Sequence, residues 1–383
     1  MLSGLDHELV LISTYPCDAP KGVELAGVIP AGFSSLGGGQ VGHTHEQRFR
    51  FLRSFVGRFR SIFLQARAVV APLILGKHQQ SLIALIREIQ PDLVHALRIP
   101  FEGMLAAAIP AGTPLVISIW GNDLTLHARK SRGMASHTRK ALQRANALIA
   151  DAERDIHLAA EWGFIEGKPS LVVPGSGGLD LALIKRVSRE GSSIPFDIPD
   201  RCPLVVNPRG FRPGSVHQDV FFKSIPLVLE AIPDAFFVCT AMRNQPLAEK
   251  WVRDLAIEDH VLLLPYLEQK DLWRMFAKAE VYISLSNHDG TPNTFLEALA
   301  CGCFPIVGDI ASLREWLDNE ENGLLVDPQD QRAAADAVIQ VLKDGNLRKR
   351  AEIKNSEILN ARADRVKIRQ QVNDFYRQVA SGS

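Results

Sequence analysis

The chain has 383 residues, of which 46% are hydrophobic, and its 43 basic side chains balance its 43 acidic ones. This length suggests two domains, and the charge balance argues against a general nucleic-acid-binding protein, which would carry a basic excess. The five cysteines do not show the spacing of a disulfide framework, so a reducing cytoplasm is expected.

No apolar run in the sequence reaches the roughly 18–20 residues that a membrane-spanning helix needs, and no signal peptide opens the chain. Cys301 and Cys303 form a close pair, but no second Cys/His pair completes a metal site. We therefore expect no metal and no other cofactor, and we interpret Cys301-Gly-Cys303 as a helix end that enters a strand.

The N-terminal part begins with two predicted strands, His7–Ser13 and Glu24–Ile29, followed by a glycine-rich stretch between residues 31 and 45. A glycine run can cradle phosphate when it lies between a strand and a helix. No clear strand precedes this run, so a flexible loop is the favoured interpretation.

Residues 47–70 combine six arginines with a stripe of phenylalanines. Phe51, Phe55, Phe59 and Phe63 recur every four residues and therefore share one face of a predicted helix. A basic helix with an aromatic stripe can lie on an anionic membrane surface. The alternative is that the stripe packs on the protein's own domain, and the pattern leaves both open.

From residue 79 onward, predicted helices and strands alternate. The strands are Asp92–Ala96, Pro114–Trp120, Ala147–Ala150 and Leu171–Pro174, and the helices are Leu82–Ile89, Phe101–Ile109, Ser136–Arg144 and Ala152–Trp162. This alternation predicts an α/β domain with a mostly parallel sheet.

Residues 188–203 interrupt this alternation with one glycine and three prolines, and we interpret them as an interdomain linker. A second series follows. Its strands are Leu204–Asn207, Phe236–Thr240, Val261–Pro265, Val281–Ser286, Phe304–Val307 and Leu324–Asp327, and its helices are Val220–Ile232, Pro246–Leu255, Gln269–Ala279, Pro292–Cys301, Leu313–Leu317 and Gln331–Leu342. Six strands alternating with helices make a complete nucleotide-binding-type domain.

We therefore expect two doubly wound, Rossmann-like domains facing each other across a cleft. The N-terminal domain covers residues 1–187, the linker residues 188–203 and the C-terminal domain residues 204–345. A charged helical tail covers residues 346–383, and one possibility for it is packing back on the N-terminal domain.

The stretch Asp289–Gly302 follows a predicted buried strand and reads as a loop, a helix and a stop. Thr291 is expected to cap the helix with Pro292 at its first position, and Gly302 suits the left-handed position beyond its end. A helix N-terminus at the carboxyl end of a strand can hold phosphate through free backbone N–H groups. Two carboxylates, Asp289 and Glu297, flank this predicted anion site.

The run S-N-H-D-G-T-P-N-T-F-L-E-A-L-A-C-G-C-F-P-I-V-G-D-I, followed by E-N-G-L-L-V-D-P, resembles the C-terminal signature of family 4 retaining glycosyltransferases of the GT-B fold. The N-terminal pieces P-D-L-V-H-A, I-W-G-N-D and V-V-P-G-S-G-G-L-D are similar to that family and stand in the expected order. The resemblance covers essentially the whole chain, and its C-terminal signature is the specific part.

This resemblance implies transfer of a sugar from a UDP- or GDP-linked donor to a lipid-linked or polysaccharide acceptor, with retention of the anomeric configuration. It implies catalytic roles for Asp289, Glu297 and Asp123. Asp289 would contact the donor sugar, and Glu297 would hold the ribose hydroxyls. The implied donor-binding residues are Arg209, Arg212, Gly290, Pro292, Asn293, Thr294 and Glu297.

Three positions depart from the family pattern. A Lys is expected some five residues after Arg209 and is absent, so Arg212 or His217 would have to replace it. Trp120 stands where the family often has His; a Trp cannot move a proton but can stack on an acceptor sugar, with Asp123 nearby. The alternative for Asp123 is that it caps the turn after the strand.

The third departure is at the start of the chain. His7–Ser13 resembles the family's second strand, so the first strand, its glycine-rich turn and the first helix are expected to be missing, through a shortened gene model or true loss. Two readings follow: an active cytoplasmic transferase, peripheral on the membrane through residues 47–70, or a degenerate, non-catalytic GT-B protein that acts as a partner or scaffold.

Overall fold

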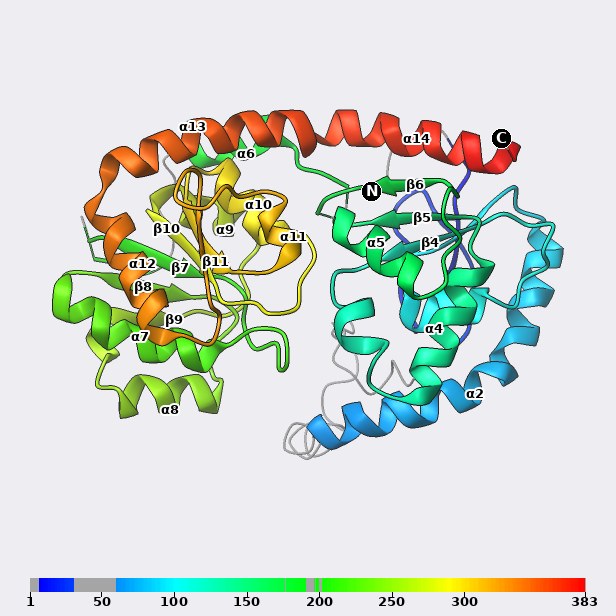
Figure 1. The fold of residues 1–383 in the computed structure, drawn as a ribbon, viewed down its shortest axis with the longest axis horizontal. Helices are drawn as coiled ribbons and strands as arrows, with labels where there is room; N and C mark the ends of the chain where they lie inside the picture. Colours follow the sequence, from blue (N-terminus) through cyan, green and yellow to red (C-terminus); the bar gives the residue numbers. More distant parts are fainter. Residues whose placement is uncertain are drawn as a thin grey trace. The chain divides into compact units, whose positions relative to one another are not determined.

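The computed structural model describes residues 7–30, 60–175, 177–190, 196, 198–199 and 202–382. The predicted glycine-rich loop at residues 31–45 and residues 47–59 of the predicted basic helix lie outside these ranges. Among the described residues, the chain forms two compact units (Figure 1). Of the described residues, the C-terminal unit contains those in 151–154 and 173–370, and the N-terminal unit contains those in 7–150, 155–172 and 371–382.

The C-terminal unit is built on a six-stranded parallel sheet of order β12-β11-β10-β7-β8-β9. Its strands are β7 Leu204–Asn207, β8 Phe236–Cys239, β9 Val261–Leu263, β10 Val281–Ser284, β11 Phe304–Gly308 and β12 Leu324–Val326. All six predicted strands are confirmed to within two residues at each end. The order is that of a doubly wound nucleotide-binding fold, with the winding direction reversing between β7 and β10.

Helices cover both faces of this sheet. They are α6 Leu181–Arg189, α7 Gln218–Ala231, α8 Pro246–Asp254, α9 Gln269–Lys278, α10 Asn293–Ala300, α11 Ala311–Arg314, α12 Gln331–Lys343 and α13 Gly345–Arg362, with a single turn η4 at Glu258–His260. Val205 of β7 packs in one core with α7, α8 and α12. Its neighbours Leu204 and Val206 pack in a second core with α6, α9 and α10. Alternating side chains of one strand thus fill two cores, as expected for a sheet buried on both faces.

Helix α6 belongs to the C-terminal unit, because its residues Ile184 and Val187 are part of the second core. No helix was predicted here, and the predicted N-terminal domain, residues 1–187, extends into this helix. The expected linker at residues 188–203 begins inside α6 and lies partly outside the described residues.

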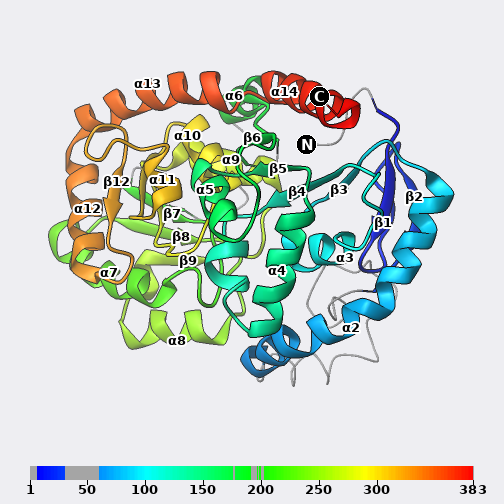
Figure 2. The same ribbon diagram turned by 45° about the vertical axis from the view of Figure 1, so that its right-hand side comes forward.

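The N-terminal unit holds two parallel sheets instead of the single sheet expected (Figure 2). One pairs β1 Val10–Ser13 with β2 Glu24–Val28, and the other has the order β3-β4-β5-β6. The strands of the second sheet are β3 Val94–Ala96, β4 Leu115–Ile119, β5 Ala147–Ala150 and β6 Ser170–Val172. Both sheets share one core, since Ile12 and Ile29 contact the same cluster as Leu115 and Ile117.

The helical segments of this unit are α2 Arg60–Ile89, η2 Ile99–Gly103, α3 Met104–Ala106, η3 Asp123–His127, α4 Arg132–Arg144, α5 Glu153–Glu161, and the end of α14 Arg365–Ser381. Helix α2 is far longer than the predicted Leu82–Ile89. It also includes residues 60–70 of the predicted basic helix, and it continues through Pro72 and Gly76, two residue types that weaken a helix locally. Tertiary packing overrides them: Pro72 is buried, and its ring lies against Gly133 of α4, where a Cβ would approach it to 3.2 Å.

The predicted helix Phe101–Ile109 is instead the tight segment η2 followed by the single turn α3. Gly103 lies where a Cβ would be 3.2 Å from the Arg98 carbonyl oxygen and 3.3 Å from Ile117, so close packing fixes this turn against the sheet. Within the described residues, no helix is both long enough and apolar enough to cross a membrane.

Candidate functional site

The site predicted in the C-terminal unit lies at the point where the winding direction of the sheet reverses. Strands β7 and β10 are neighbours and parallel, so they end at the same edge of the sheet. Arg209 follows β7 by two residues, and Asp289 follows β10 by five. Open α/β sheets bind their ligands at this reversal, outside the carboxyl ends of the strands.

The loop after β7 is held by a buried chain of side-chain hydrogen bonds. Asn207 donates through Nδ2 to Gln218 Oε1 at 2.7 Å, and Gln218 donates through Nε2 to the Gly210 carbonyl oxygen at 2.7 Å. The Arg209 N–H donates to Asn207 Oδ1 at 3.2 Å. These contacts fix the backbone that carries Arg209, because buried side chains hold both the Arg209 N–H and the Gly210 carbonyl oxygen.

The loops that carry Arg209 and Asp289 are also joined to each other. Val216 and Ser286 form an antiparallel bridge, flanked by a hydrogen bond from the His217 N–H to the Leu285 carbonyl oxygen and one from the Asn287 N–H to the Ser215 carbonyl oxygen, both at 2.9 Å. The two loops therefore form one rigid edge above the sheet.

Arg209 and Asp289 form an ion pair from Nη2 to Oδ2. Both side chains are largely buried, and the Ser286 hydroxyl donates to the same Oδ2 at 3.4 Å. The Gly290 N–H donates to Oδ1 at 3.2 Å. The Arg209 Nε is buried and has no hydrogen-bond partner among the described residues, so this guanidinium retains a donor for a ligand.

Helix α10 begins one residue later than predicted. Pro292 occupies the N-cap position, and no side chain caps the helix. Thr291 is therefore not the cap: its hydroxyl donates to the Asp151 carbonyl oxygen at 2.7 Å and accepts from Trp316 Nε1 at 3.1 Å. Its buried position, where two other groups already satisfy the hydroxyl, overrides the local preference of Thr for capping.

The first turn of α10 keeps the features of an anion-binding helix end. Gly290 and Pro292 are buried, while Asn293 is exposed and Thr294 is half-buried. The first N–H groups of a helix have no partner within the helix, and its dipole favours negative charge there. The Thr294 side-chain oxygen also lacks a hydrogen-bond partner among the described residues. At the other end, Gly302 has φ +91°, which confirms the predicted left-handed stop.

Gly175 supports this turn from below. Its φ is +53°, and a Cβ on it would lie 2.7 Å from both Asn293 Oδ1 and Leu296 Cδ1. Only glycine therefore allows the chain after β6 to pass this closely beneath the start of α10.

Glu297 lies in the first turns of α10 and is only 4% exposed. Gln269 of α9 donates to its Oε1 through Nε2 at 2.7 Å. Burial raises the pKa of Glu297 above its usual value of 4.5, and the hydrogen bond from Gln269 partly opposes this rise. A buried carboxylate with a single amide partner can accept further hydroxyl donors.

The two candidates for the missing lysine also lie in the loop after β7. Arg212 donates through Nε to the Arg209 carbonyl oxygen at 3.2 Å, and burial, together with the nearby Arg209, lowers the pKa of Arg212. Two guanidinium groups this close repel each other, and a bound anion would relieve that repulsion. His217 is held through its backbone N–H, and its buried Nε2 has no hydrogen-bond partner in the described part of the chain.

The two site residues predicted in the N-terminal unit differ in exposure. Trp120, at the carboxyl end of β4, is 47% exposed, whereas Asp123 is fully buried. Asp123 Oδ1 pairs with Arg98 Nε at 2.8 Å, and Oδ2 accepts from the N–H groups of Ile99 at 3.3 Å and Trp120 at 3.2 Å. Asp123 thus holds the loop after β4, as expected if it caps the turn there. Neither of its carboxylate oxygens is exposed to solvent.

Arg98 is a residue that sequence reasoning missed. Its guanidinium lies 5.4 Å from the centre of the Trp120 ring and also donates to Asn122 Oδ1 at 2.9 Å. A cation over one face of an indole ring orients the ring and leaves its other face open. Arg98 carries no local sequence signal, because its partners are 22–25 residues away.

Four more residues shape the C-terminal site without having been predicted: Ser286, Gln269, Gly175 and Gly308. A signal for the two glycines existed in the resembling motifs V-V-P-G-S-G-G-L-D and P-I-V-G-D. Cys301 caps the end of α10, and Cys303 directly precedes β11, which confirms the interpretation of this pair as a helix end entering a strand.

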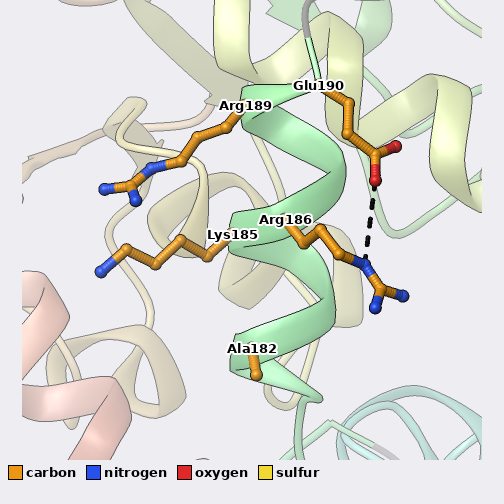
Figure 3. A pocket seen from close by; sticks show the side chains of 5 residues that line it. All are labelled: Ala182, Lys185, Arg186, Arg189 and Glu190. Carbon is orange, nitrogen blue, oxygen red and sulfur yellow. Dashed lines mark ion pairs between the residues drawn. The ribbon is translucent and has the colours of Figure 1, made fainter.

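A depression also lies along α6, and none of the predicted site residues lines it (Figure 3). It is lined by Ala182, Lys185, Arg186, Arg189 and Glu190, and Arg186 is paired with Glu190 at 3.8 Å. Figure 3 shows the three basic side chains spread outward from the helix, so the feature is a solvated basic face without converging groups.

Two family models match the chain: "Glycosyl transferases group 1" over residues 216–357 and "Glycosyl transferase 4-like" over residues 62–152. Among curated proteins, a Campylobacter jejuni protein, N-acetylgalactosamine-N,N'-diacetylbacillosaminyl-diphospho-undecaprenol 4-alpha-N-acetylgalactosaminyltransferase, is 33% identical over 119 residues. That match covers 30% of this chain and 32% of the relative, so the chain matches about a third of that protein's length. The putative teichuronic acid biosynthesis glycosyltransferase TuaC of Bacillus subtilis is 23% identical over 66% of this chain and 61% of its own length.

Solved structures match over more of the chain. Sucrose-phosphate synthase from Thermosynechococcus elongatus superposes with a TM-score of 0.69 at 17% identity, covering 98% of this chain and 90% of that one. Anabaena HepE in complex with UDP gives a TM-score of 0.63 at 17% identity, covering 81% and 83%. The chain therefore has the GT-B fold, and its matched segments are similar to glycosyltransferases of the GT4 type.

Proposed function

We propose that this protein transfers a sugar from a UDP- or GDP-linked donor to a lipid-linked or polysaccharide acceptor, with retention of the anomeric configuration. The observation that carries this proposal is the donor-type site of the C-terminal unit. There the start of α10, the Arg209–Asp289 pair and the buried carboxylate of Glu297 lie around one edge of the sheet.

The donor's diphosphate would bind the N–H groups at Asn293 and Thr294 and the guanidinium groups of Arg209 and Arg212. A leaving diphosphate gains negative charge, and fixed N–H donors and cations stabilise that charge as it develops. Arg209 can serve here without leaving Asp289, because one nitrogen holds the carboxylate and Nε remains unpartnered. This arrangement needs no metal ion.

Glu297 would accept hydrogen bonds from the two ribose hydroxyls, and Asp289 would do so from hydroxyls of the donor sugar. Both carboxylates are already oriented, Glu297 by Gln269 and Asp289 by Arg209. Preorganised acceptors lose little conformational freedom on binding, so they orient the sugar at low cost.

The acceptor would use the exposed ring of Trp120 as a platform for a sugar ring. Asp123 is then a positioning residue that holds Trp120 and Arg98 in place through its buried carboxylate. The Campylobacter relative is named for a diphospho-undecaprenol-linked acceptor, which supports a lipid-linked glycan as the acceptor class. Binding of residues 47–70 to an anionic membrane surface, at the cytoplasmic face, fits such an acceptor and stays a prediction.

A screen of nucleotide sugars tests the proposal. Isothermal titration with UDP and GDP should detect binding of one of them, and the matching donor should be consumed when a polyprenyl-diphosphate glycan is supplied. Nuclear magnetic resonance of the product reads the anomeric configuration. Glu297→Ala should abolish nucleotide binding, whereas Glu230→Ala, an exposed Glu of α7 in the same unit, should not. Absence of binding to every nucleotide would overturn the donor assignment.

A non-catalytic binding role is the second candidate, and one observation favours it. Arg209 and Asp289 pair with each other without a ligand, so each of the two charges already has an opposite charge beside it. The same titration separates the two roles: a scaffold would bind a nucleotide or a partner but would consume no donor with any acceptor.

A further inference from the structure

We propose that Ser286 is a positioning residue for the transfer reaction: its hydroxyl and the Arg209 guanidinium fix one carboxylate oxygen of Asp289, so that the other oxygen faces the donor sugar. This inference rests on the proposed function and adds a residue to it. Ser286 itself would not touch the substrate.

The sequence of β10 and the residues after it shows an unusual alternation. Val281, Ile283 and Leu285 point into one apolar core. Tyr282, Ser284 and Ser286 alternate with them on the other face, and all three are buried. Burying hydroxyl groups costs free energy unless they are hydrogen-bonded, so two buried serines in succession on one face need a reason.

The hydrogen bonds along this face have a defined direction. Ser284 and Ser286 are joined oxygen to oxygen at 3.0 Å, and Ser286 Oγ donates to Asp289 Oδ2 at 3.4 Å. A carboxylate only accepts, and a serine hydroxyl has one proton. The Ser286 hydroxyl therefore donates its hydrogen bond to Asp289, and the Ser284 hydroxyl donates to Ser286. The chain of hydroxyls ends on the carboxylate.

Asp289 is held asymmetrically as a result. Among the described residues, Oδ2 accepts from both Arg209 and Ser286, whereas Oδ1 accepts only from the N–H of the adjacent Gly290, at 3.2 Å. A carboxylate oxygen can accept two hydrogen bonds. Oδ1 thus keeps acceptor capacity for a sugar hydroxyl, with its direction set by the two contacts on Oδ2.

The backbone of Ser286 is fixed independently of its hydroxyl. A Cβ on Gly308 of β11 would lie 2.0 Å from the Ser286 carbonyl oxygen, so only glycine permits this contact. On the other side, Ser286 is bridged to Val216 in the loop that follows Arg209. Removal of the hydroxyl should therefore leave the loop in place and change only the orientation of Asp289.

This separation of roles predicts a specific kinetic change. Misorientation of a group that contacts the reacting sugar lowers the rate of transfer by about 10- to 100-fold. The contacts proposed for the nucleotide, with Glu297, Arg209, Arg212 and the start of α10, include neither Ser286 nor the Asp289 carboxylate. Ser286→Ala should therefore lower kcat by at least about tenfold while the Kd for UDP or GDP changes by less than about twofold.

The experiment uses the full chain, with UDP and GDP as binding probes and the donor that the wild type consumes. Ser224→Ala is the matched control, because Ser224 is 1% exposed and its hydroxyl donates to the Phe221 carbonyl oxygen at 2.7 Å, within α7. It should cost a similar amount of thermal stability and leave kcat unchanged. Asp289→Asn supplies the background for a double-mutant cycle.

In the Asp289→Asn background, Ser286→Ala should have no further effect on kcat, since it acts through the carboxylate. Wild-type kcat in Ser286→Ala, or fully additive losses in the double variant, would overturn the positioning role while leaving the transferase assignment intact. A wild-type protein that binds neither nucleotide and consumes no donor would instead overturn the proposed function itself.

Discussion

At the scale of single residues, the donor-type site depends on a carboxyl group whose ionised form is disfavoured by burial. Glu297 is 4% exposed, and its pKa is raised by burial. A carboxyl group with a raised folded-state pKa binds more protons when folded than when unfolded, so its ionisation costs stability as the pH rises through that range. A ribose diol that donates to the carboxylate would offset this cost in the bound state.

Nucleotide binding is therefore expected to depend on pH. The ionised form of Glu297 accepts hydroxyl donors, so affinity should fall as the pH is lowered from neutral toward the raised pKa of Glu297. Titration of UDP or GDP by calorimetry across this range measures the effect. Glu297→Gln should bind more weakly at neutral pH and lose the pH dependence. An unchanged pH profile in this variant would show that another group titrates.

Arg212 is the residue that we expect to replace the absent lysine on the diphosphate. A charge-assisted hydrogen bond contributes about 1.5–3 kcal/mol, so Arg212→Ala should weaken UDP or GDP binding by about 10- to 100-fold. It should barely affect uridine or guanosine, which lack the diphosphate. Arg243→Ala, an exposed arginine in the same unit, is the control. Equal losses for nucleotide and nucleoside would place Arg212 away from the phosphates.

At the scale of elements, the start of α10 needs the chain after β6 to pass directly beneath it. Gly175→Ala should disturb this contact twice, through a φ of +53° that alanine tolerates poorly and through atoms 2.7 Å away on Asn293 and Leu296. We expect nucleotide affinity to fall at least tenfold, because the displaced turn carries the phosphate-binding N–H groups.

Gly167→Ala is the control that separates the cost of a positive φ from the displacement of neighbouring atoms. Gly167 has φ +84°, and nothing lies within 4 Å of the position of its Cβ, so it imposes the backbone cost alone. Calorimetric Kd values and melting temperatures of both variants make the comparison. Similar losses of nucleotide affinity in Gly175→Ala and Gly167→Ala would mean that the close contact between Gly175 and α10 does not contribute to nucleotide binding.

The elements were predictable from sequence where the pattern is local. The strands of the C-terminal sheet and Gly302 at the end of α10 follow from apolar runs and helix-stop chemistry. The length of α2 was not predictable, because a buried Pro72 contradicts its own local preference. The cap of α10 was assigned to Thr291 by local rules, but a distant carbonyl, that of Asp151, takes its hydroxyl.

The candidate site shows the same division. The local pattern predicts the helix start between Asp289 and Glu297, and the family resemblance implies the roles of the residues there, whereas neither indicates the side chains that support them. Gln269 reaches Glu297 across 28 positions, and Arg98 reaches Asp123 across 25. Such contacts depend on which helices and loops become neighbours, and no short window of sequence contains that information.

At the scale of the whole molecule, the chain completes its N-terminal unit last. It leaves this unit after residue 172, forms the C-terminal unit, and returns at residue 371 with the end of α14. Tyr376 of α14 lies against His95 of β3, with Oη 2.6 Å from Nδ1, while Ser118 of β4 lies 2.8 Å from Nε2. The last helix is thus tied to β3 and β4 of the N-terminal sheet through the half-buried imidazole of His95.

Burial lowers the pKa of His95 to about 3, so the ring stays neutral and needs both of its hydrogen-bond partners. Tyr376→Phe leaves one ring nitrogen unpaired in a buried place, which costs about 1–3 kcal/mol of unfolding free energy. Urea unfolding followed by fluorescence should show this loss. Tyr266→Phe, at a tyrosine that is 79% exposed, should change the unfolding free energy by less than about 0.5 kcal/mol.

Because Tyr376 lies in the N-terminal unit and touches none of the donor-site residues, Tyr376→Phe should leave the Kd for UDP or GDP unchanged. Lowered nucleotide affinity in the folded variant would show that the last helix also influences the donor site, and an unchanged unfolding free energy would show that the tie to His95 carries no stability.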